Sequence, residues 1–134
     1  MATIQKDFEV PASADAVWEV VRDFANVQRL APGFVTRCTP EEAGAVRLLT
    51  FFNGLEVRER LVTMDDAGRR LVYTAFGGRA QHHNATVQVI PLSADRCRFV
   101  WTTDLLPDAL QPAMEQMMAR GAEVMRSALT LPAR

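Results

Sequence analysis

The sequence predicts an α+β fold in which a curved antiparallel sheet of seven strands wraps around one long C-terminal helix. Three observations support this prediction. Most of residues 34–104 alternate like strands broken by turns, two short helical segments follow a first strand, and residues 107 to about 129 have helical spacing. We expect residues 1–134 to form one domain, in keeping with their number.

The N-terminal elements are a strand and two short helices. Residues 3–10 alternate between apolar and polar and predict a strand, which Pro11 interrupts. Ser13 is a good N-cap for the first helix. A second helical segment covers residues 26–30 and stops before Pro32.

Six further strands are expected in the middle of the chain. Their predicted ranges are 34–39, 46–52, 55–64, 70–76, 81–90 and 96–103. The sequences Asn53-Gly54 and Asp66-Ala67-Gly68 provide residues that favour turns between neighbouring strands.

The last helix is predicted to begin at Pro107 and Asp108, with Asp108 as a candidate cap, and to end at about Leu129. Its apolar stripe consists of Leu110, Met114, Met117, Met118, Gly121, Met125 and Ala128. Flexible thioethers suit either a surface that fits a variable guest or an ordinary core with gaps to fill. Gly121 favours a cavity, because a glycine removes side-chain volume from the inward face.

Composition excludes several classes of function. The net charge of -1 gives no basic field for nucleic acid. No apolar run approaches the roughly 18 residues of a membrane span, and the N-terminus lacks a signal-peptide pattern, so we expect a cytoplasmic protein. Cys38 and Cys97 lie in separate strand-like segments without a ligand pattern. We expect buried free thiols and no metal site.

His83 lies on the apolar face of its predicted strand. It shares that face with Ala85, Val87 and Val89, while the alternate positions are polar. A buried imidazole needs hydrogen-bond partners. It is therefore either a satisfied core residue or part of a polar site in the interior.

Glu59 is also predicted to point inward, and the preceding hairpin decides whether Arg47 meets it. A two-residue loop pairs Phe52 with Leu55 and turns Arg47 outward. A three-residue loop pairs Phe51 with Leu55 and places Arg47 opposite Glu59. A shift of one residue changes the face of every side chain, so both registers stay open at this point. An inward ion pair could also fix the register without touching a ligand.

Aromatic residues complete the predicted lining. Tyr73 lies on one strand, and Phe99 and Trp101 on another, although plain core packing is an alternative for each. Polar groups in an apolar interior are typical of a small-molecule pocket. The candidate ligand-binding residues are Arg47, Phe51, Glu59, Tyr73, His83, Phe99, Trp101, Met114, Met118 and Gly121.

Several short motifs, together with the order of elements, resemble the START-like (SRPBCC) superfamily. They are Val17-Trp18 after a Pro-Ala-Ser turn, Gly54 followed by Val57-Arg58-Glu59-Arg60-Leu61, then Leu71-Val72-Tyr73 and Val100-Trp101. This helix-grip group includes the birch pollen allergen, polyketide cyclases and aromatases, and the plant abscisic-acid receptors. The resemblance implies a cavity between the sheet and the last helix that accepts hydrophobic small molecules. Its pattern of Arg before the hairpin and Glu after it favours the three-residue loop.

The abscisic-acid receptors differ from this chain at the two loops that close over their hormone. The gate region is Asn53-Gly54-Leu55-Glu56, without the family's proline, and the latch region is Gly77-Gly78-Arg79-Ala80-Gln81. These departures disfavour hormone-gated phosphatase binding. The resemblance carries Glu59 over as a pocket residue and places His83 where those receptors have a tyrosine.

Two classes of function remain. The first is binding of a small hydrophobic molecule, aromatic or lipid-like, by a monomer or homodimer. The second is a cofactor-free cyclase or dehydratase in which His83 or Glu59 moves a proton while Tyr73 or Arg47 stabilises negative charge. A third possibility, an interaction subunit with a vestigial cavity, predicts an interior filled by large side chains.

Overall fold

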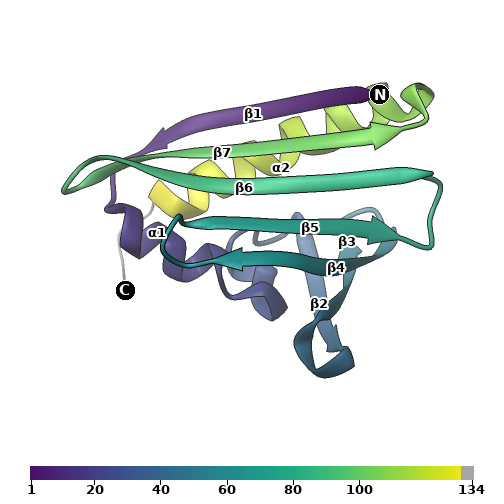
Figure 1. Cartoon of the computed structure of the whole chain (residues 1–134), viewed down its shortest axis with the longest axis horizontal. Coiled ribbons are helices and arrows are strands. Elements are labelled where there is room, and N and C mark those ends of the chain that lie inside the picture. The colour runs from purple at the N-terminus through teal and green to yellow at the C-terminus, as the bar shows by residue number, and fades with distance from the viewer. Residues whose placement is uncertain (131–134) are drawn as a thin grey trace.

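A seven-stranded antiparallel sheet dominates the computed structural model, which describes residues 1–130 (Figure 1). The strands are β1 (Ala2–Val10), β2 (Val35–Glu41), β3 (Val46–Phe51), β4 (Glu56–Asp65), β5 (Arg70–Phe76), β6 (His82–Ser93) and β7 (Arg96–Leu106). Their order in the sheet is β1-β7-β6-β5-β4-β3-β2. Strands β2 and β3 run steeply across the direction of β6 and β7, so the sheet is strongly curved (Figure 1). The predicted fold class is confirmed.

Two short helical elements connect β1 to β2, as predicted. Helix α1 (Ala14–Val21) is capped by the Ser13 hydroxyl, whose oxygen accepts the Ala16 N–H at 3.1 Å. The second element is a 3-10 helix, η1 (Phe24–Arg29). It begins two residues earlier than expected, since Phe24 turns inward and joins the core.

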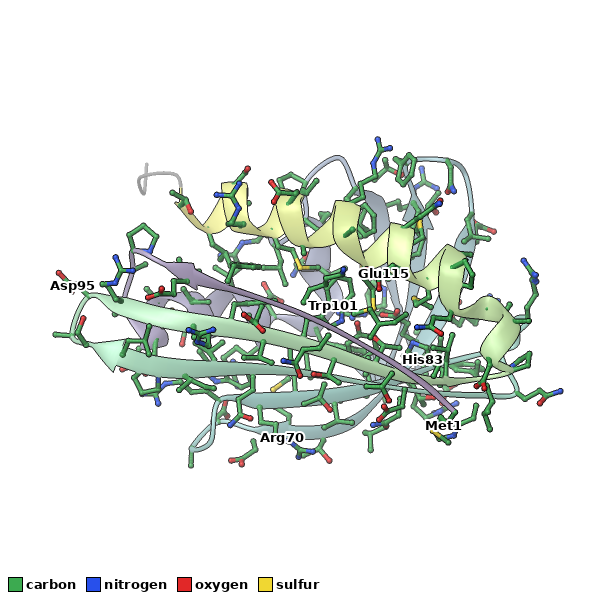
Figure 2. All side chains as sticks on the ribbon, turned by 90° about the horizontal axis from the view of Figure 1, so that it is seen from above. Met1, Arg70, His83, Asp95, Trp101 and Glu115 are labelled. Carbon is green, nitrogen blue, oxygen red and sulfur yellow. The ribbon has the colours of Figure 1, made fainter. Side chains whose placement is uncertain are left out.

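The C-terminal helix lies along the concave face of the sheet. Viewed from above, helix and sheet form two layers, with Trp101 in the layer of side chains between them (Figure 2). The chain first makes a 3-10 turn, η3 (Asp108–Leu110), and then helix α2 (Gln111–Thr130). The prediction that Asp108 caps the long helix is wrong. Asp108 lies in the 3-10 turn, three residues before α2 begins at Gln111, and its carboxylate pairs with the Met1 amino group at 3.2 Å.

The hairpin between β3 and β4 adopts the three-residue loop. Phe51 N–H donates to the Leu55 carbonyl at 2.9 Å, and Gly54 takes a positive φ of 85°. Arg47 therefore stands directly opposite Glu59. The register that the family pattern favoured is the one present.

Strands β6 and β7 extend beyond their predicted ends at residues 90 and 103. The two strands pair with each other from His82 and Leu106 to Ser93 and Arg96. This long pairing, interrupted by one register shift between Pro91 and Ser93, supports end segments that lack clear hydrophobic alternation. Within residues 1–130, none of the helices is both long and apolar enough for a membrane span.

Candidate functional site

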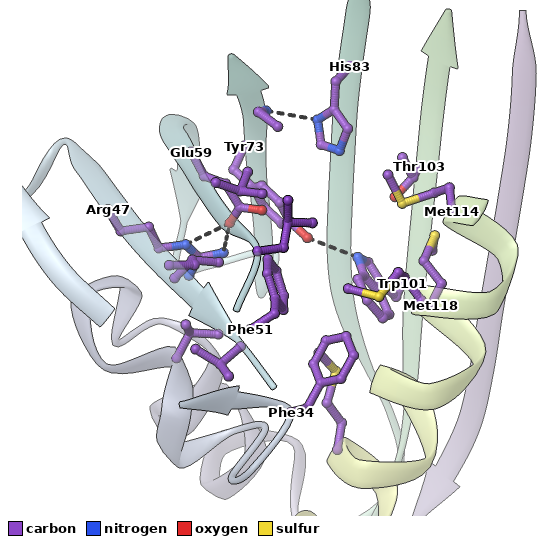
Figure 3. Close-up of a pocket in the computed structure, with 18 residues that line it drawn as sticks. Phe34, Arg47, Phe51, Glu59, Tyr73, His83, Trp101, Thr103, Met114 and Met118 are labelled. Carbon is purple, nitrogen blue, oxygen red and sulfur yellow. Dashed lines mark hydrogen bonds and ion pairs between the residues drawn. The ribbon is translucent and has the colours of Figure 1, made fainter. Parts of the chain in front are cut away.

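An internal cavity of about 140 Å³ lies between the concave face of the sheet and α2 (Figure 3). Eight predicted residues line it: Arg47, Phe51, Glu59, Tyr73, His83, Trp101, Met114 and Met118. The cavity is lined mainly by apolar side chains, and the polar ones come from the sheet. Leu55 at its rim is 51% exposed, which indicates that the cavity reaches the surface beside the β3–β4 hairpin.

Arg47 and Glu59 form a buried ion pair across β3 and β4. The Glu59 Oε1 atom accepts Arg47 Nε–H at 2.8 Å and lies 2.7 Å from Arg47 Nη2, while Arg47 Nη1–H donates to the Phe24 carbonyl at 3.0 Å. The guanidinium also lies 4.0 Å from the Phe24 ring centroid and 4.9 Å from that of Tyr73. These partners compensate the cost of burying the charges.

One oxygen of Glu59 remains available to the cavity. Both contacts to Arg47 use Oε1, and Figure 3 shows the second oxygen directed toward the open space. Within residues 1–130, no protein group donates a hydrogen bond to Oε2. Glu59 can therefore accept a hydrogen bond from a bound molecule.

Tyr73 and Trp101 are joined by a hydrogen bond that crosses the sheet. The Trp101 indole N–H donates to the Tyr73 hydroxyl oxygen at 3.0 Å. Complete burial raises the pKa of the Tyr73 hydroxyl, so this group stays protonated at neutral pH. Its hydrogen has no acceptor among the described residues.

His83 lies where β5 and β6 separate. The backbone N–H of Ala75 donates to His83 Nδ1 at 2.9 Å, and the hydroxyl of Thr74 bonds to the His83 carbonyl. Burial lowers the pKa of the ring, whereas the nearby charge of Glu59 opposes that shift. His83 is thus a neutral, largely buried imidazole at the cavity wall.

Helix α2 contributes the apolar wall. Met114, Met117, Met118 and Met125 all line the cavity, and Met118 is fully buried. Two of the four were predicted site residues, and the other two lie in the same predicted stripe. A long unbranched thioether side chain can change rotamer to fit a guest.

Phe99 does not line the cavity, contrary to the prediction. It lies on the inward face of β7 but pairs with Phe8 of β1, and the two rings stack with centroids 4.8 Å apart. Alternation correctly gave its face. Alternation does not show which part of the strand borders the cavity. Phe99 lies beside β1, where the core is filled by side chains.

The prediction that Gly121 opens the cavity is also wrong. A Cβ at this position would lie 2.9 Å from Phe34 Cε2 and 3.2 Å from Trp101 Cζ3. The two rings occupy the volume that glycine leaves free. Gly121 therefore allows close packing of the helix against aromatic side chains.

The structure adds lining residues that were not among the candidates. They are Val27, Phe34, Val35, Leu49, Leu55, Val57, Ala75, Thr103, Met117 and Met125. Leu49 has the same strand parity as Arg47 and Phe51, so that pattern could have identified it. Val27 lies in the 3-10 helix η1, and Phe34 lies in the turn before β2 and not in the strand predicted to begin there, so strand parity does not place either side chain.

Within residues 1–130, no cluster of three or more His, Cys, Asp and Glu side chains is arranged to hold a metal ion. The cysteines Cys38 and Cys97 are free thiols in separate strands, with Cys97 buried and Cys38 partly so. Burial raises the pKa of both thiols. Neither cysteine is among the residues that line the cavity.

A curved sheet closed by a helix, with a cavity between them, defines a helix-grip protein. The chain belongs to the family described as polyketide cyclase / dehydrase and lipid transport, whose model matches residues 1–130. This membership agrees with the START-like resemblance seen in the sequence. A search of curated proteins gave no match.

Solved structures with the same fold include three informative cases. A protein from Thermobifida fusca is 30% identical, with 97% of this chain and 91% of the other covered and a TM-score of 0.82. The protein XoxI from Bacillus cereus is 20% identical over 96% of each chain, with a TM-score of 0.86. Norcoclaurine synthase from Thalictrum flavum, in complex with dopamine and hydroxybenzaldehyde, is 20% identical, with 99% and 89% covered and a TM-score of 0.70.

Proposed function

We propose that this protein binds a small, largely apolar molecule in the cavity between sheet and helix, with a polar end directed at Glu59, Tyr73 and His83. The observation that carries the proposal is the combination of an apolar enclosure with polar atoms that have no protein partner. Glu59 Oε2 and the Tyr73 hydroxyl hydrogen are such atoms among the described residues. A guest that pairs with such an atom gains about 0.5–1.5 kcal/mol net from each hydrogen bond.

The family and one structural neighbour support this choice. The family description names lipid transport beside cyclase and dehydrase activity. The norcoclaurine synthase structure holds dopamine and hydroxybenzaldehyde, so the same fold can accommodate small aromatic molecules. A vestigial cavity is disfavoured, because an open volume of about 140 Å³ remains after all large side chains are placed.

The proposal is tested by filling the cavity. Ala75 lines it, whereas Ala119 on α2 is exposed, so Ala75→Leu and Ala119→Leu make the same change in two environments. Acetophenone binding is followed by titration calorimetry and by chemical-shift changes of the methionine methyl groups. We expect binding by the native chain and by Ala119→Leu, and loss of binding in folded Ala75→Leu. Equal binding by both variants contradicts the proposal.

A second candidate is proton transfer to and from an enolisable guest. The free Oε2 of Glu59 favours it, because a carboxylate oxygen facing the cavity can take a proton from carbon. Glu59 is the better base, since the lone pair on His83 Nδ1 is already used by Ala75. Incubation of acetophenone in D₂O with the protein tests this idea. Deuterium should enter its methyl group faster with the native chain than with Glu59→Gln, provided that the variant still binds acetophenone. Equal rates for the two proteins remove the enzymatic candidate.

A further inference from the structure

The polar wall of the cavity is the part of the sheet that carries Glu59, Tyr73 and His83. Which of its atoms can donate or accept a hydrogen bond depends on a break in the pairing of two strands. Strands β5 and β6 pair as far as Tyr73 and Ala85. Continuing that register would place Ala75 opposite His83, but no backbone pair forms there. The Ala75 N–H instead donates to the His83 ring at 2.9 Å. The imidazole thus replaces a backbone carbonyl as acceptor in the sheet.

This hydrogen bond fixes the tautomer of His83. Nδ1 can accept from Ala75 only if it carries no proton, so the hydrogen of the neutral ring lies on Nε2. Protonating Nδ1 would bring two N–H groups against each other. Figure 3 shows the ring edge that carries the other nitrogen turned toward the cavity. His83 therefore presents a hydrogen-bond donor and no available acceptor.

The neighbouring Tyr73 hydroxyl has the same character. Its oxygen accepts the Trp101 N–H at 3.0 Å, and its hydrogen remains available to a guest. Tyr73 and His83 are close, with ring centroids 6.1 Å apart. Two donors thus lie on adjacent strands of the polar wall.

Glu59 supplies the complementary acceptor. Its Oε2 faces the cavity, while Oε1 is held by Arg47. Within residues 1–130, Arg47 is the only Lys or Arg that lines the cavity, and Glu59 and the Phe24 carbonyl already bind it. An anionic guest would meet the Glu59 carboxylate with no free cation to balance it, which is costly in an apolar enclosure.

The size of the cavity limits the guest further. A cavity of roughly 150 Å³ lined by apolar side chains holds one benzene ring. The volume here is about 140 Å³, with an opening beside Leu55. One ring with short substituents is therefore the appropriate size, and a two-ring molecule or an extended lipid chain would have to project from the opening.

We propose, building on the binding function above, that the cavity selects a neutral single-ring molecule with an acceptor oxygen for His83 and Tyr73 and a hydroxyl for Glu59, and discriminates against carboxylates. A hydroxyaryl ketone or aldehyde is the simplest such ligand class. The ketone oxygen accepts from His83 Nε2–H and the Tyr73 hydroxyl. The ring hydroxyl donates to Glu59 Oε2.

The test compares probes of one size at pH 7 by titration calorimetry. The probes are 3- and 4-hydroxyacetophenone, acetophenone, 4-ethylphenol and 4-hydroxybenzoate. We expect at least one hydroxyacetophenone to bind about 10-fold more tightly than acetophenone, which lacks the hydrogen bond to Glu59, and at least about 10-fold more tightly than 4-ethylphenol, which lacks the two hydrogen bonds to the ketone oxygen. We expect 4-hydroxybenzoate to bind most weakly. If acetophenone or the benzoate equals the better hydroxyacetophenone, the ligand class is wrong while the binding function stands. If no ring compound binds, both proposals fail.

Two substitutions of His83 separate its structural and recognition roles. In His83→Asn the amide can accept from Ala75 but does not reach the position of Nε2. In His83→Gln the longer side chain returns an N–H donor to that position. The preference for the hydroxyacetophenone over 4-ethylphenol should shrink in the Asn variant, where only the Tyr73 donor remains, and persist in the Gln variant. A preference unchanged in folded His83→Asn contradicts the role assigned to His83.

Discussion

The two walls of the cavity differ in kind. The sheet wall carries Glu59, Tyr73 and His83, and each is fixed by a hydrogen bond or ion pair to another strand of the sheet. The helix wall presents methionine side chains that make no such bonds among the described residues. A sheet sets the positions of polar atoms through its register, whereas unbranched side chains on a helix adapt in shape. We infer that the sheet wall determines which groups a guest must carry and the helix wall determines its size.

The largest expected effect comes from breaking the sheet wall at its ion pair. Arg47→Met leaves the buried Glu59 carboxylate without its cation, which should lower the free energy of unfolding by about 3–5 kcal/mol. Urea denaturation measures the change. Replacing both residues in Arg47→Met, Glu59→Leu should recover most of the loss, because no charge is then left unpaired. A loss below about 1 kcal/mol in the single variant would show that the pair is not desolvated.

Shortening the helix wall should cost less and alter the size of the guest. Met118 is fully buried, and Met118→Ala should lower the free energy of unfolding by about 2–3 kcal/mol. The enlarged cavity should admit 2-acetylnaphthalene, which the native chain should bind weakly. Leu92→Ala, at a residue that is 48% exposed, serves as the control and should change stability by less than about 0.5 kcal/mol. Exclusion of 2-acetylnaphthalene by Met118→Ala would contradict the assignment of size selection to the helix.

The burial of His83 in the sheet wall should make the stability of the protein depend on pH. The pKa of His83 lies below its ordinary value of 6.5, mainly because of burial, with His82 adding to the shift and Glu59 opposing it. The unfolded chain therefore takes up this proton at a higher pH than the folded chain. The contribution of His83 is fully present above about pH 6.5 and is lost as pH falls through the folded pKa.

Urea denaturation between pH 7.5 and 5 measures this dependence. We expect the free energy of unfolding to fall with decreasing pH by up to about 1.4 kcal/mol per unit from this group. His83→Asn should remove that part of the slope. The ¹⁵N shifts of the native ring should show a proton on Nε2 at neutral pH. A proton on Nδ1 would contradict the tautomer assigned above.

The smallest expected change in stability comes from a contact between α2 and the β3–β4 hairpin, near the cavity opening. The Arg120 guanidinium of α2 lies 3.7 Å from the centroid of the Phe52 ring on the β3–β4 hairpin. Arg120→Gln should cost about 0.5–1 kcal/mol and speed the dissociation of acetophenone, since it frees the hairpin from the helix. Arg126→Gln is the matched control, because Arg126 pairs with Glu123 on the same helix. Equal dissociation rates in the two variants would show that this contact does not restrain the opening.

Much of the fold could be predicted from the sequence because alternation and helical spacing are local signals. Strand β5 has its predicted bounds, and the burial of His83, Ala85, Val87 and Val89 follows the predicted face. The inward direction of Glu59 was predicted in the same way. The predicted C-terminal ends of β6 and β7 were less accurate, because the two strands keep pairing over residues that show no clear alternation of apolar and polar side chains.

The site itself could be predicted only in part, because a cavity depends on position along an element as well as on face. Phe99 and Trp101 share one face of β7, yet only Trp101 lines the cavity. Gly121 was predicted to leave open volume in the cavity, whereas the ring of Phe34, which is distant in sequence, occupies that volume.

The sequence by itself determined the order of elements, the inward faces of strands such as β5, β6 and β7, and the methionine stripe, since these follow from the periods of strand and helix. Only the tertiary structure decided that Arg47 meets Glu59, through the hairpin register, and that Ala75 meets His83, through the parting of β5 and β6. Such partners lie on different strands, and no local pattern specifies them. They fix which atoms of the polar wall remain available to a guest.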